Sequence, residues 1–536
     1  MSAELDIATL HEALAGEFGD EPCVVDAGRV WSWREVTDRT RRLAAVLREH
    51  GLGTLRVGAA GPAWETGQDH LGILLHNSAE YLEALLGAHK ASVVPFNINY
   101  RYTADELTYL LRDARPQALV YGASFAPLVA EVLPALEAEP LLLQVADDSG
   151  AALLPGALDY EKALAAAEPQ VFDPSADDRQ LMYTGGTTGM PKGVIWRSGD
   201  LVAGPFGVRG KDGQPLQSVD DAVRRARKIR GRVLPAPPLM HGAGLAVAVG
   251  GWLGGGTVVI QPRPEKLDPA VLLDTCARER VTTIVIVGDA FGGPIVAELE
   301  RQPRELPDLR VIVNAGAALR PELKRRLGEL LPGARVTDLV ASSEGVVVRK
   351  DKGDGNRLDA RGGIAVLAED RSRLLGPGED EVGWLAKSGG IPLGYLGDPE
   401  KTAQTFVSVG GQRFSVPGDR ARIAEDGGIE FLGRDATTIN TGGEKVFADE
   451  VEQVVRALPG VLDAVVVGRP SERWGNEVVA LVQPGADLAV GELGALCRKS
   501  LAGYKVPKDF ILVDEVRRHA NGKPDYKWAR AAASTA

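Results

Sequence analysis

The chain of 536 residues is too long for one ordinary hydrophobic core, so two or more domains are expected. Hydrophobic residues make up 44% of it and charged residues 25%, which are ordinary values for a globular protein. The formal net charge of −12, from 61 basic and 73 acidic residues, argues against a nucleic-acid-binding protein, which would carry a basic stripe.

Cysteine usage and hydropathy narrow the class further. Cys23, Cys276 and Cys497 lie far apart, which gives neither a disulfide framework nor a metal-ligand spacing, and we expect a cytoplasmic protein. The first residues are acidic and no signal peptide is apparent. The uncharged stretch 233–261 is broken by prolines and glycines, so it predicts buried strands and loops rather than an integral membrane segment.

Residues 1–180 alternate short apolar runs with helical patterns, which predicts a mostly parallel sheet covered by helices. Two helix starts carry capping boxes, Ser32 with Glu35 and Thr103 with Glu106. The strands and the helix expected near them cover 70–75, 78–90 and 93–97.

The most informative stretch runs from Thr184 to Gly193 and holds four glycines and three threonines. Such a segment cannot pack a core, but its backbone N–H groups can turn toward one point, and its threonine hydroxyls and Lys192 add donors and a charge. This is the chemistry of a phosphate cradle. It is not a Walker A loop, because Gly193 follows the lysine where Ser or Thr is required. The alternative is a flexible surface hairpin.

The sequence Tyr-Thr-Gly-Gly-Thr-Thr-Gly-x-Pro-Lys-Gly resembles the signature loop of the adenylate-forming superfamily, which contains acyl-CoA synthetases, peptide-synthetase adenylation domains and luciferases. Six or more motifs lie in family order from about Leu10 to Arg530. The resemblance implies an α/β fold, with a large multi-subdomain N-terminal AMP-binding domain over 1–432 whose sheets are covered by helices. A small, mobile α+β C-terminal domain over 433–536 would follow it.

The resemblance also implies an ATP site built from the glycine loop and several later motifs. Val340 and Ala341 stand where the family has an aromatic residue and a glycine, and Pro417 replaces a threonine two residues before Asp419. The residues implied in ATP or AMP binding are Thr184, Gly185, Gly186, Thr187, Thr188, Gly189, Lys192, Gly316, Ala317, Ala318, Asp338, Val340, Ala341, Ser342, Ser343, Asp419 and Arg434.

Three residues are implied in catalysis. Lys523, in the turn Asn521-Gly522-Lys523-Pro524, matches the lysine that serves adenylation. His241 matches the family's histidine beside the acyl carboxylate; a satisfied core histidine is the alternative. Glu344 stands where the family's motif has its glutamate. With the Thr184 hydroxyl it predicts a Mg²⁺ site, since a carboxylate near a triphosphate needs a cation between them.

The remaining implied sites concern the acyl group, CoA and the hinge. Small residues, among them Gly244, Gly292 and Gly293, predict room for a bulky apolar acyl group. The acyl pocket is expected to include His241, Gly242, Leu245, Asp289 and Phe291. The pantetheine tunnel for CoA is expected at Gly442, Gly443 and Lys445, and the hinge at Asp435 or Ala436.

Residues 287–291 and 440–447 resemble acyl-CoA ligases that act on fatty, steroid side-chain or terpenoid acids. The resulting hypothesis is an ATP-dependent acyl-CoA ligase that activates a bulky hydrophobic carboxylic acid as an acyl-AMP, releases pyrophosphate and transfers the acyl group to CoA. Two alternatives stay open: an acyl-AMP ligase that loads a carrier protein, and a protein that holds an acyl-adenylate without turnover. A γ-phosphate-transferring NTPase is disfavoured, because no Walker pair is present. The basic patch 224–228 predicts a solvated helix face, with a contact to CoA phosphates as the alternative. A homodimer is left open.

Overall fold

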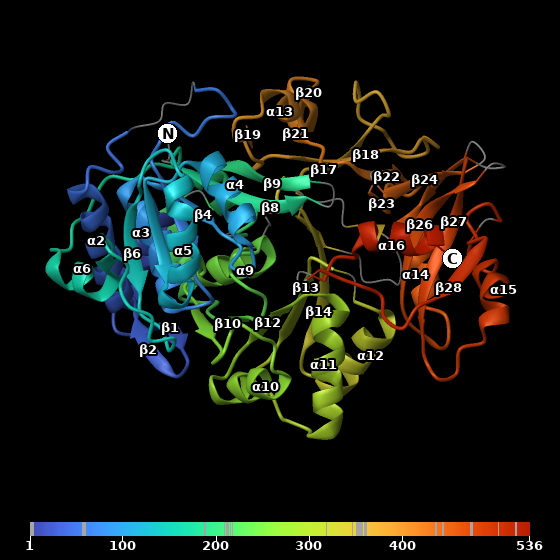
Figure 1. The fold of residues 1–536 in the computed structure, drawn as a ribbon, viewed down its shortest axis with the longest axis horizontal. Coiled ribbons are helices and arrows are strands. Elements are labelled where there is room, and N and C mark those ends of the chain that lie inside the picture. The colour runs from blue at the N-terminus through green and yellow to red at the C-terminus, as the bar shows by residue number, and fades with distance from the viewer. Residues whose placement is uncertain are drawn as a thin grey trace.

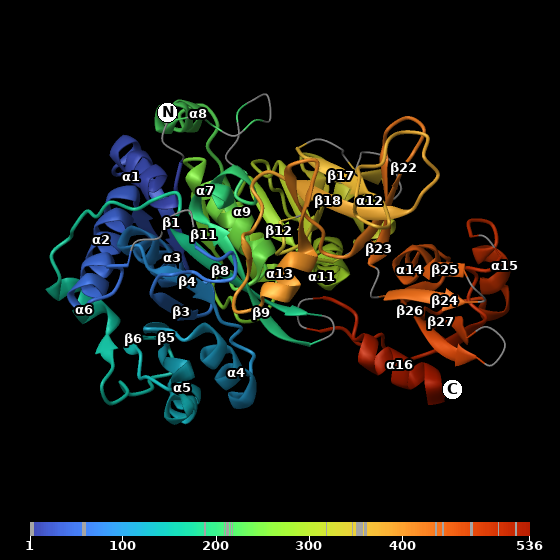
Figure 2. The ribbon, with the colours of Figure 1, turned by 90° about the horizontal axis from the view of Figure 1, so that it is seen from above.

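The computed structural model describes residues 5–55, 61–186, 189–207, 210, 214, 216, 218–317, 319–345, 347–349, 357–358, 362–434, 437–441, 444–471, 475–501, 503–519 and 522–535. Figure 1 shows a large N-terminal part, coloured blue through orange, with a small red C-terminal lobe beside it. The view from above in Figure 2 shows the same division. This is the mixed α/β architecture with a large and a small part that the motifs predicted.

Two sheets, each of eight strands in the described residues, form the framework of the large domain. The first has the order β15-β14-β13-β12-β10-β11-β1-β2, and the second β19-β9-β8-β4-β3-β5-β6-β7. The first contains β1 (Pro22–Asp26), β2 (Arg29–Ser32), β10 (Arg232–Pro235), β11 (Thr257–Ile260), β12 (Thr283–Ile286), β13 (Val311–Ala315), β14 (Arg335–Ala341) and β15 (Val347–Arg349). The second contains β3 (His70–Leu74), β4 (Val94–Asn97), β5 (Ala118–Gly122), β6 (Leu141–Val145), β7 (Leu158–Asp159), β8 (Arg179–Gly186), β9 (Gly189–Arg197) and β19 (Gly394–Tyr395).

Helices cover both sheets and fill the space between them. The central core joins residues of both sheets to helices α1 (Ile7–Phe18), α2 (Trp33–Glu49), α3 (Ala79–Ala91), α6 (Tyr160–Ala166), α7 (Ser198–Ala203), α8 (Val219–Ala226) and α9 (Gly242–Leu253). A second core packs the outer face of the first sheet on α10 (Pro269–Arg278), α11 (Gly288–Arg301) and α12 (Pro321–Leu330). A third packs the outer face of the second sheet on α4 (Ala104–Ala114) and α5 (Ala126–Val132).

A third sheet completes the large domain and leads into the small one. It contains β16 (Arg357–Leu358), β17 (Ile364–Leu367), β18 (Gly383–Ser388), β20 (Phe406–Val409), β21 (Gln412–Ser415), β22 (Asp419–Ile423) and β23 (Ile429–Arg434), with α13 (Pro399–Thr405) before β20. Gly433 and Arg434 still pair with β22, so they belong to this sheet.

The small lobe is a sheet with helices on both faces. Its strands are β24 (Thr438–Thr441), β25 (Glu444–Phe447), β26 (Val461–Ser471), β27 (Gly475–Pro484) and β28 (Asp509–Leu512). One face packs on α14 (Ala448–Arg456) and α15 (Leu493–Cys497), and the other on α16 (Tyr526–Thr535).

Several predicted elements are confirmed, and one differs. Both capping boxes are present, and β3, α3 and β4 lie where strands and a helix were expected. The glycine-rich stretch, expected as a loop, is mostly strand: β8 continues through Gly186 and β9 begins at Gly189, so the two strands extend the sheet as a hairpin. Among the described residues, no helix has the length and apolarity needed to cross a membrane.

Candidate functional site

The glycine-rich hairpin is anchored at its base by the neighbouring helix and strand. The Tyr183 hydroxyl donates to Asp113 of α4 at 2.6 Å, and the Tyr183 ring fills the space where a Cβ on Gly193 would lie, 2.9 Å away. Thr184 and Lys192 are register partners, as are Gly186 and Gly189. Thr187 and Thr188, at the tip, lie outside the described residues.

The predicted phosphate-binding lysine has a carboxylate partner from a distant segment. Lys192 Nζ lies 2.6 Å from Asp398 Oδ2, and this contact holds the pKa of the Asp398 carboxyl below its usual value. Asp398 also caps α13 by accepting from the Lys401 amide. The Leu396 amide donates to the Gly193 carbonyl. The turn after β19 therefore bonds both the backbone of β9 and its Lys192 side chain.

Glu344, the predicted metal ligand, is held beside the same hairpin. Its Oε1 accepts from the Tyr395 hydroxyl at 2.9 Å, and the preceding carbonyl, of Ser343, accepts from Trp196 Nε1 of β9 at 3.1 Å. Gly345 has φ of +97° and lies against Trp196, a position that favours glycine. Ser342 Oγ is buried and has no hydrogen-bond partner among the described residues.

His241 is half-buried, and one of its ring nitrogens has no hydrogen-bond partner among the described residues. It precedes α9 as its N-cap, and its Nε2 is buried with no partner among the described residues. Burial, followed by the positive charges of Arg101 and Lys523, lowers the pKa of His241 to about 4, so the imidazole is neutral at neutral pH. Because buried polar atoms are nearly always bonded, Ser342 Oγ and His241 Nε2 are each candidates for a contact with a ligand.

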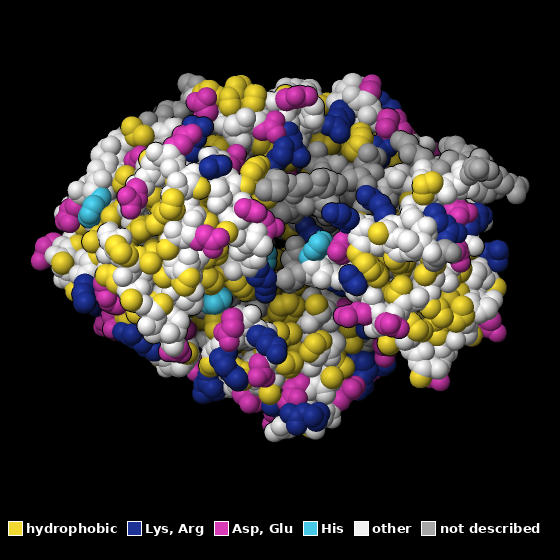
Figure 3. Space-filling view, in the orientation of Figure 1, with side chains coloured by type: hydrophobic (Ala, Val, Ile, Leu, Met, Phe, Trp, Pro, Cys, Tyr) yellow, Lys and Arg dark blue, Asp and Glu magenta, His cyan; other side chains and the backbone are white. Residues whose placement is uncertain are grey.

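The lysine turn of the small lobe lies on the large domain. A Cβ on Gly522 would be 3.3 Å from Val287 Cγ1 and 3.4 Å from Ala317 Cβ. Lys523 is therefore next to the turn after β13, and its charge acts on His241. Figure 3 shows a hollow where the lobe meets the large domain, with Lys and Arg side chains at its edge. Lys523 is thus near the turn at Ala317 and within electrostatic reach of His241.

The predicted adenine-facing turn is tied down by a buried asparagine. Asn314 accepts from the Gly288 amide at 2.7 Å and donates to the Ala317 carbonyl at 3.1 Å and to Asp338 Oδ1 at 2.9 Å. The second Asp338 oxygen accepts from Lys324. Asp338 is therefore occupied by protein partners and serves here to join β14 to β13.

Asp419 and Arg434, both implied at the ribose, are register partners on β22 and β23, and Asp419 is buried. Several other predicted residues cannot be placed. Ala318, Asp435, Ala436, Gly442 and Gly443 lie outside the described residues, as do the side chains of Thr184, Val340, Arg434 and Lys445. Of Gly185, Gly186 and Gly189 the structure describes the backbone, as parts of β8 and β9. In the described backbone, Val340 pairs with Val348 and Ala341 with Val347.

The residues predicted for the acyl pocket separate into two groups. Gly242 stays next to His241, as expected, and a Cβ placed on it would meet no described atom within 4 Å. Leu245 is buried in the central core, and Phe291 packs against the outer core under the first sheet. Asp289 is paired with Arg320 at 2.7 Å. The latter three residues therefore serve packing or pairing in this structure.

Beside most of the glycines expected to leave room for the acyl group, other atoms of the protein already occupy the space. A Cβ on Gly244 would lie 2.8 Å from the Pro238 carbonyl oxygen, and one on Gly292 would lie 2.5 Å from Leu319 Cδ1. These glycines allow backbone and side chains to approach closely. A Cβ on Gly293 would meet only Leu323 Cδ1 among the described residues, at 4.0 Å, so the face of α11 at Gly293 is open.

The basic patch on α8 is a paired surface. Arg224 pairs with Asp221, and Arg227 and Arg230 pair with Glu17 and Glu21 near α1. Figure 2 shows α8 at the opposite side of the large domain from the small lobe. This arrangement agrees with the solvated-face interpretation.

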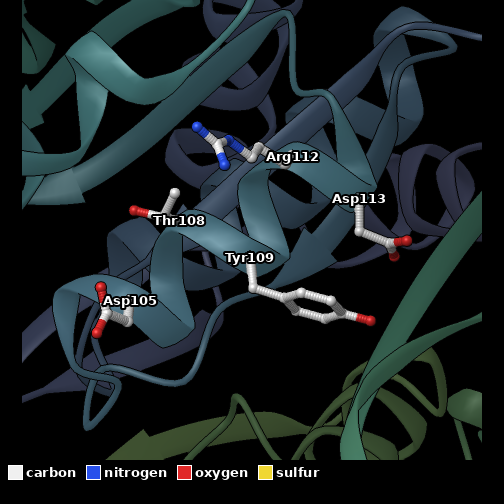
Figure 4. A pocket seen from close by; sticks show the side chains of 5 residues that line it. All are labelled: Asp105, Thr108, Tyr109, Arg112 and Asp113. Carbon is white, nitrogen blue, oxygen red and sulfur yellow. The ribbon is translucent and has the colours of Figure 1, made fainter.

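A shallow hollow of about 420 Å³ lies along α4, lined by Asp105, Thr108, Tyr109, Arg112 and Asp113. Figure 4 shows that all of these side chains come from that one helix. None of them was predicted as a site residue. The hollow is beside the anchor of the glycine hairpin and is distinct from the His241–Lys523 region.

No three His, Cys, Asp or Glu side chains in the described residues gather to hold a metal ion by themselves. That is compatible with Mg²⁺, which proteins commonly bind through one or two carboxylates together with substrate phosphates. Glu344, the carboxylate predicted for this role, accepts a hydrogen bond from Tyr395.

Sequence reasoning gave no site role to four residues that hold the candidate site residues in place: Asn314, Tyr395, Asp398 and Asn97, whose amide donates to the Tyr183 and Met240 carbonyls. Asp398 carried a local signal, because an Asp before Pro399 is a typical helix cap. The partners of the other three lie far along the chain, and no local pattern points to them.

Comparison with known proteins identifies the family. Residues 11–361 match the family described as AMP-binding enzyme, and 450–523 match the AMP-binding enzyme C-terminal domain. The chain is 45% identical to the medium-chain acyl-CoA ligase Mig of Mycobacterium avium, covering 98% of this chain and 97% of the relative. It is 35% identical to a 3-oxocholest-4-en-26-oate–CoA ligase of Rhodococcus rhodochrous, covering 98% and 95%.

Solved structures share the fold over the full length. ATP-bound MatB from Rhodopseudomonas palustris has a TM-score of 0.77 at 26% identity, covering 98% of this chain and 99% of that one. The anthranilate CoA ligase AuaEII, in complex with anthranoyl-AMP, has a TM-score of 0.80 at 20% identity, covering 100% and 98%. The chain therefore belongs to the AMP-binding enzymes, the adenylate-forming family that its motifs indicated, and is one of that family's acyl-CoA ligases.

Proposed function

We propose that this ligase activates a bulky, hydrophobic carboxylic acid, of the medium-chain or steroid side-chain kind, and transfers it to CoA. One observation carries the assignment of the site: the Gly522–Lys523 turn of the small lobe lies on Val287 and Ala317, close enough for the Lys523 charge to act on His241, whose Nε2 is buried. The relatives named for medium-chain and steroid acids support the substrate class.

In the first half-reaction, a carboxylate oxygen of the acid attacks the α-phosphorus of ATP, and the bond to the β-phosphate breaks to release pyrophosphate. Negative charge moves onto the departing pyrophosphate. The glycine hairpin with Lys192, and the Lys523 ammonium, would stabilise that charge. Neutral His241, in the tautomer protonated at Nε2, would donate a hydrogen bond to the acid's carboxylate, since Nε2 has no partner among the described residues.

Mg²⁺ would be held by Glu344 with the Thr184 hydroxyl and would neutralise phosphate charge. The Tyr395 hydroxyl fixes Glu344 Oε1, so the carboxylate is oriented before the nucleotide arrives. Gly316, Ala317, Ser342, Ser343, Asp419 and Arg434 would bind the adenosine part.

In the second half-reaction, the CoA thiolate attacks the acyl carbonyl and AMP leaves. By family resemblance, the small lobe rotates about the hinge at 435–436 and brings the turn at 442–443 to the site. Lys523→Ala should then lose most adenylation yet convert supplied acyl-adenylate to acyl-CoA. Equal loss of both half-reactions contradicts this role.

The function is tested by incubating the purified chain with ATP, Mg²⁺, CoA and a panel of acids: medium-chain, long-chain, steroid side-chain and terpenoid. Pyrophosphate, AMP and acyl-CoA are measured. Acyl-CoA with AMP supports the proposal. AMP and acyl-AMP without thioester points to a carrier-protein acceptor, and no pyrophosphate above background overturns catalysis. Cytoplasmic location and a homodimer stay predictions.

A further inference from the structure

One half-buried side chain connects two parts of the proposed site. Asn97, the last residue of β4, donates from Nδ2 to the carbonyl oxygens of Tyr183, at 2.9 Å, and Met240, at 2.7 Å. Its Oδ1 accepts from the Tyr183 amide at 2.9 Å. Only one orientation of the amide fits, since two carbonyls need the NH₂ group and an N–H needs the oxygen.

The two segments it joins are the ones that carry the chemistry. Tyr183 directly precedes Thr184 at the start of the glycine-rich stretch, and Met240 directly precedes His241. The backbones of β4 and β8 pair at Phe96 and Leu181, one residue before Asn97 on β4. The Asn97 amide continues the pairing at the end of the strand and extends it to the histidine segment.

The histidine segment needs such donors because of its prolines. Pro235, Pro237 and Pro238 have no N–H, so this stretch cannot form a regular ladder. Asn77 supplies further bonds: it donates to the carbonyls of Pro235 and Pro237 and accepts from the Leu239 amide at 2.6 Å. Of the two segments, Asn77 bonds only the histidine segment, whereas Asn97 bonds both. Variants at Asn77 are therefore a useful comparison for variants at Asn97.

We propose that Asn97 is a positioning residue that fixes the phosphate-binding hairpin relative to His241, and thereby the ATP α-phosphorus relative to the acid's carboxylate. This inference rests on the proposed function. Attack requires the reacting atoms to lie about 3–3.5 Å apart, and a misplacement of about 1 Å can cost on the order of 100-fold in rate. Asn97 acts before the acyl-phosphate bond forms and is not needed once that bond exists.

The test separates the two half-reactions in four variants. Asn97→Asp keeps the acceptor for the Tyr183 amide but loses both donated bonds. Asn97→Ser removes the amide without adding charge, leaving a shorter side chain with one O–H in place of two N–H donors, and covers the case in which the aspartate variant does not fold. Asn77→Asp loosens only the histidine segment. Asn99→Asp is the matched control, because its oxygen can still accept from the Arg101 amide.

Both Asn97 variants should lower adenylation by about 10- to 100-fold, while conversion of supplied acyl-adenylate to acyl-CoA stays within about threefold of wild type. KM should rise for both ATP and the acid. Asn77→Asp should raise KM for the acid alone, and Asn99→Asp should change neither half-reaction.

Parallel loss of both half-reactions in the Asn97 variants, or unchanged adenylation, overturns the inference. A shift of KM for one substrate only also overturns it, because the coupling would be absent. Wild-type protein that forms no acyl-adenylate with any acid overturns the proposed function itself, and that result appears in the wild-type arm alone.

Discussion

Gly522 of the small lobe lies against Val287 of the large domain, so closely that a Cβ on Gly522 would be 3.3 Å from Val287 Cγ1. Gly522 also has φ of +77°, where L side chains are strained. A side chain at residue 522 would therefore be strained by its backbone and would require Val287 to move by a few tenths of an ångström in the lobe orientation that brings Lys523 toward His241.

Gly522→Ala should impair adenylation. The added methyl group must push the lobe from Val287 and Ala317, and its positive φ costs about 1–3 kcal/mol. We expect about a 10- to 100-fold loss in the pyrophosphate-forming half-reaction, with thioester formation from supplied acyl-adenylate largely kept. Adding Val287→Ala should restore part of the activity, and Gly491→Ala, in open space of the same lobe, should have no effect. An inactive Gly491→Ala, or no rescue, would count against the steric explanation.

Arg518 holds the shape of the lysine turn. It pairs with Asp463 through Nε at 2.7 Å and Nη2 at 2.8 Å, and its Nη1 donates to the Gly522 carbonyl at 3.0 Å. A lysine cannot reproduce this fork. Arg518→Lys should therefore slow adenylation by about tenfold and affect thioester formation less, whereas Arg517→Lys, on an exposed neighbour, should behave like wild type. Equal effects of the two substitutions in half-reaction assays would contradict this role.

Local signals predicted much of the fold, and tertiary contacts account for what they missed. The capping boxes at Ser32 and Thr103 depend on side chains three residues apart, so the sequence reveals them. Lys192 and Asp398 are 206 residues apart, and no local pattern announces their pairing. Leu245 was expected in the acyl pocket because it follows the histidine motif, but it is buried in the central core; a position next to a motif does not say which neighbour a helix face will meet.

Asp398→Asn should strengthen ATP binding. The Lys192 ammonium is shared with the Asp398 carboxylate, which competes with an incoming phosphate for the same charge. Asparagine is also a good helix cap, so α13 should be retained. We expect KM for ATP to fall by a few fold with KM for the acid unchanged. The measurement is initial-rate pyrophosphate release over an ATP series. A higher KM for ATP would mean that Asp398 orients Lys192 for the phosphate.

His241 should make the folded chain sensitive to acid. Its pKa is lowered to about 4 in the folded state, mainly by burial, against about 6.5 in the unfolded chain. Between these values the unfolded chain binds a proton that the folded chain does not, so the free energy of unfolding falls as pH decreases through this window. The gap corresponds to ~3 kcal/mol as an upper value.

His241→Gln removes this titration and keeps an amide that can hydrogen-bond. The urea midpoint of the variant minus that of wild type should increase progressively as pH falls from 6.5 to 4.5. Above pH 7 this difference should be constant. The other buried histidines are common to both proteins and cancel in the comparison. Because the imidazole stays neutral from pH 6 to 8, the substitution should lower kcat/KM for the acid without changing the shape of its pH profile there. A midpoint difference that does not vary with pH would show that His241 titrates normally and is not desolvated.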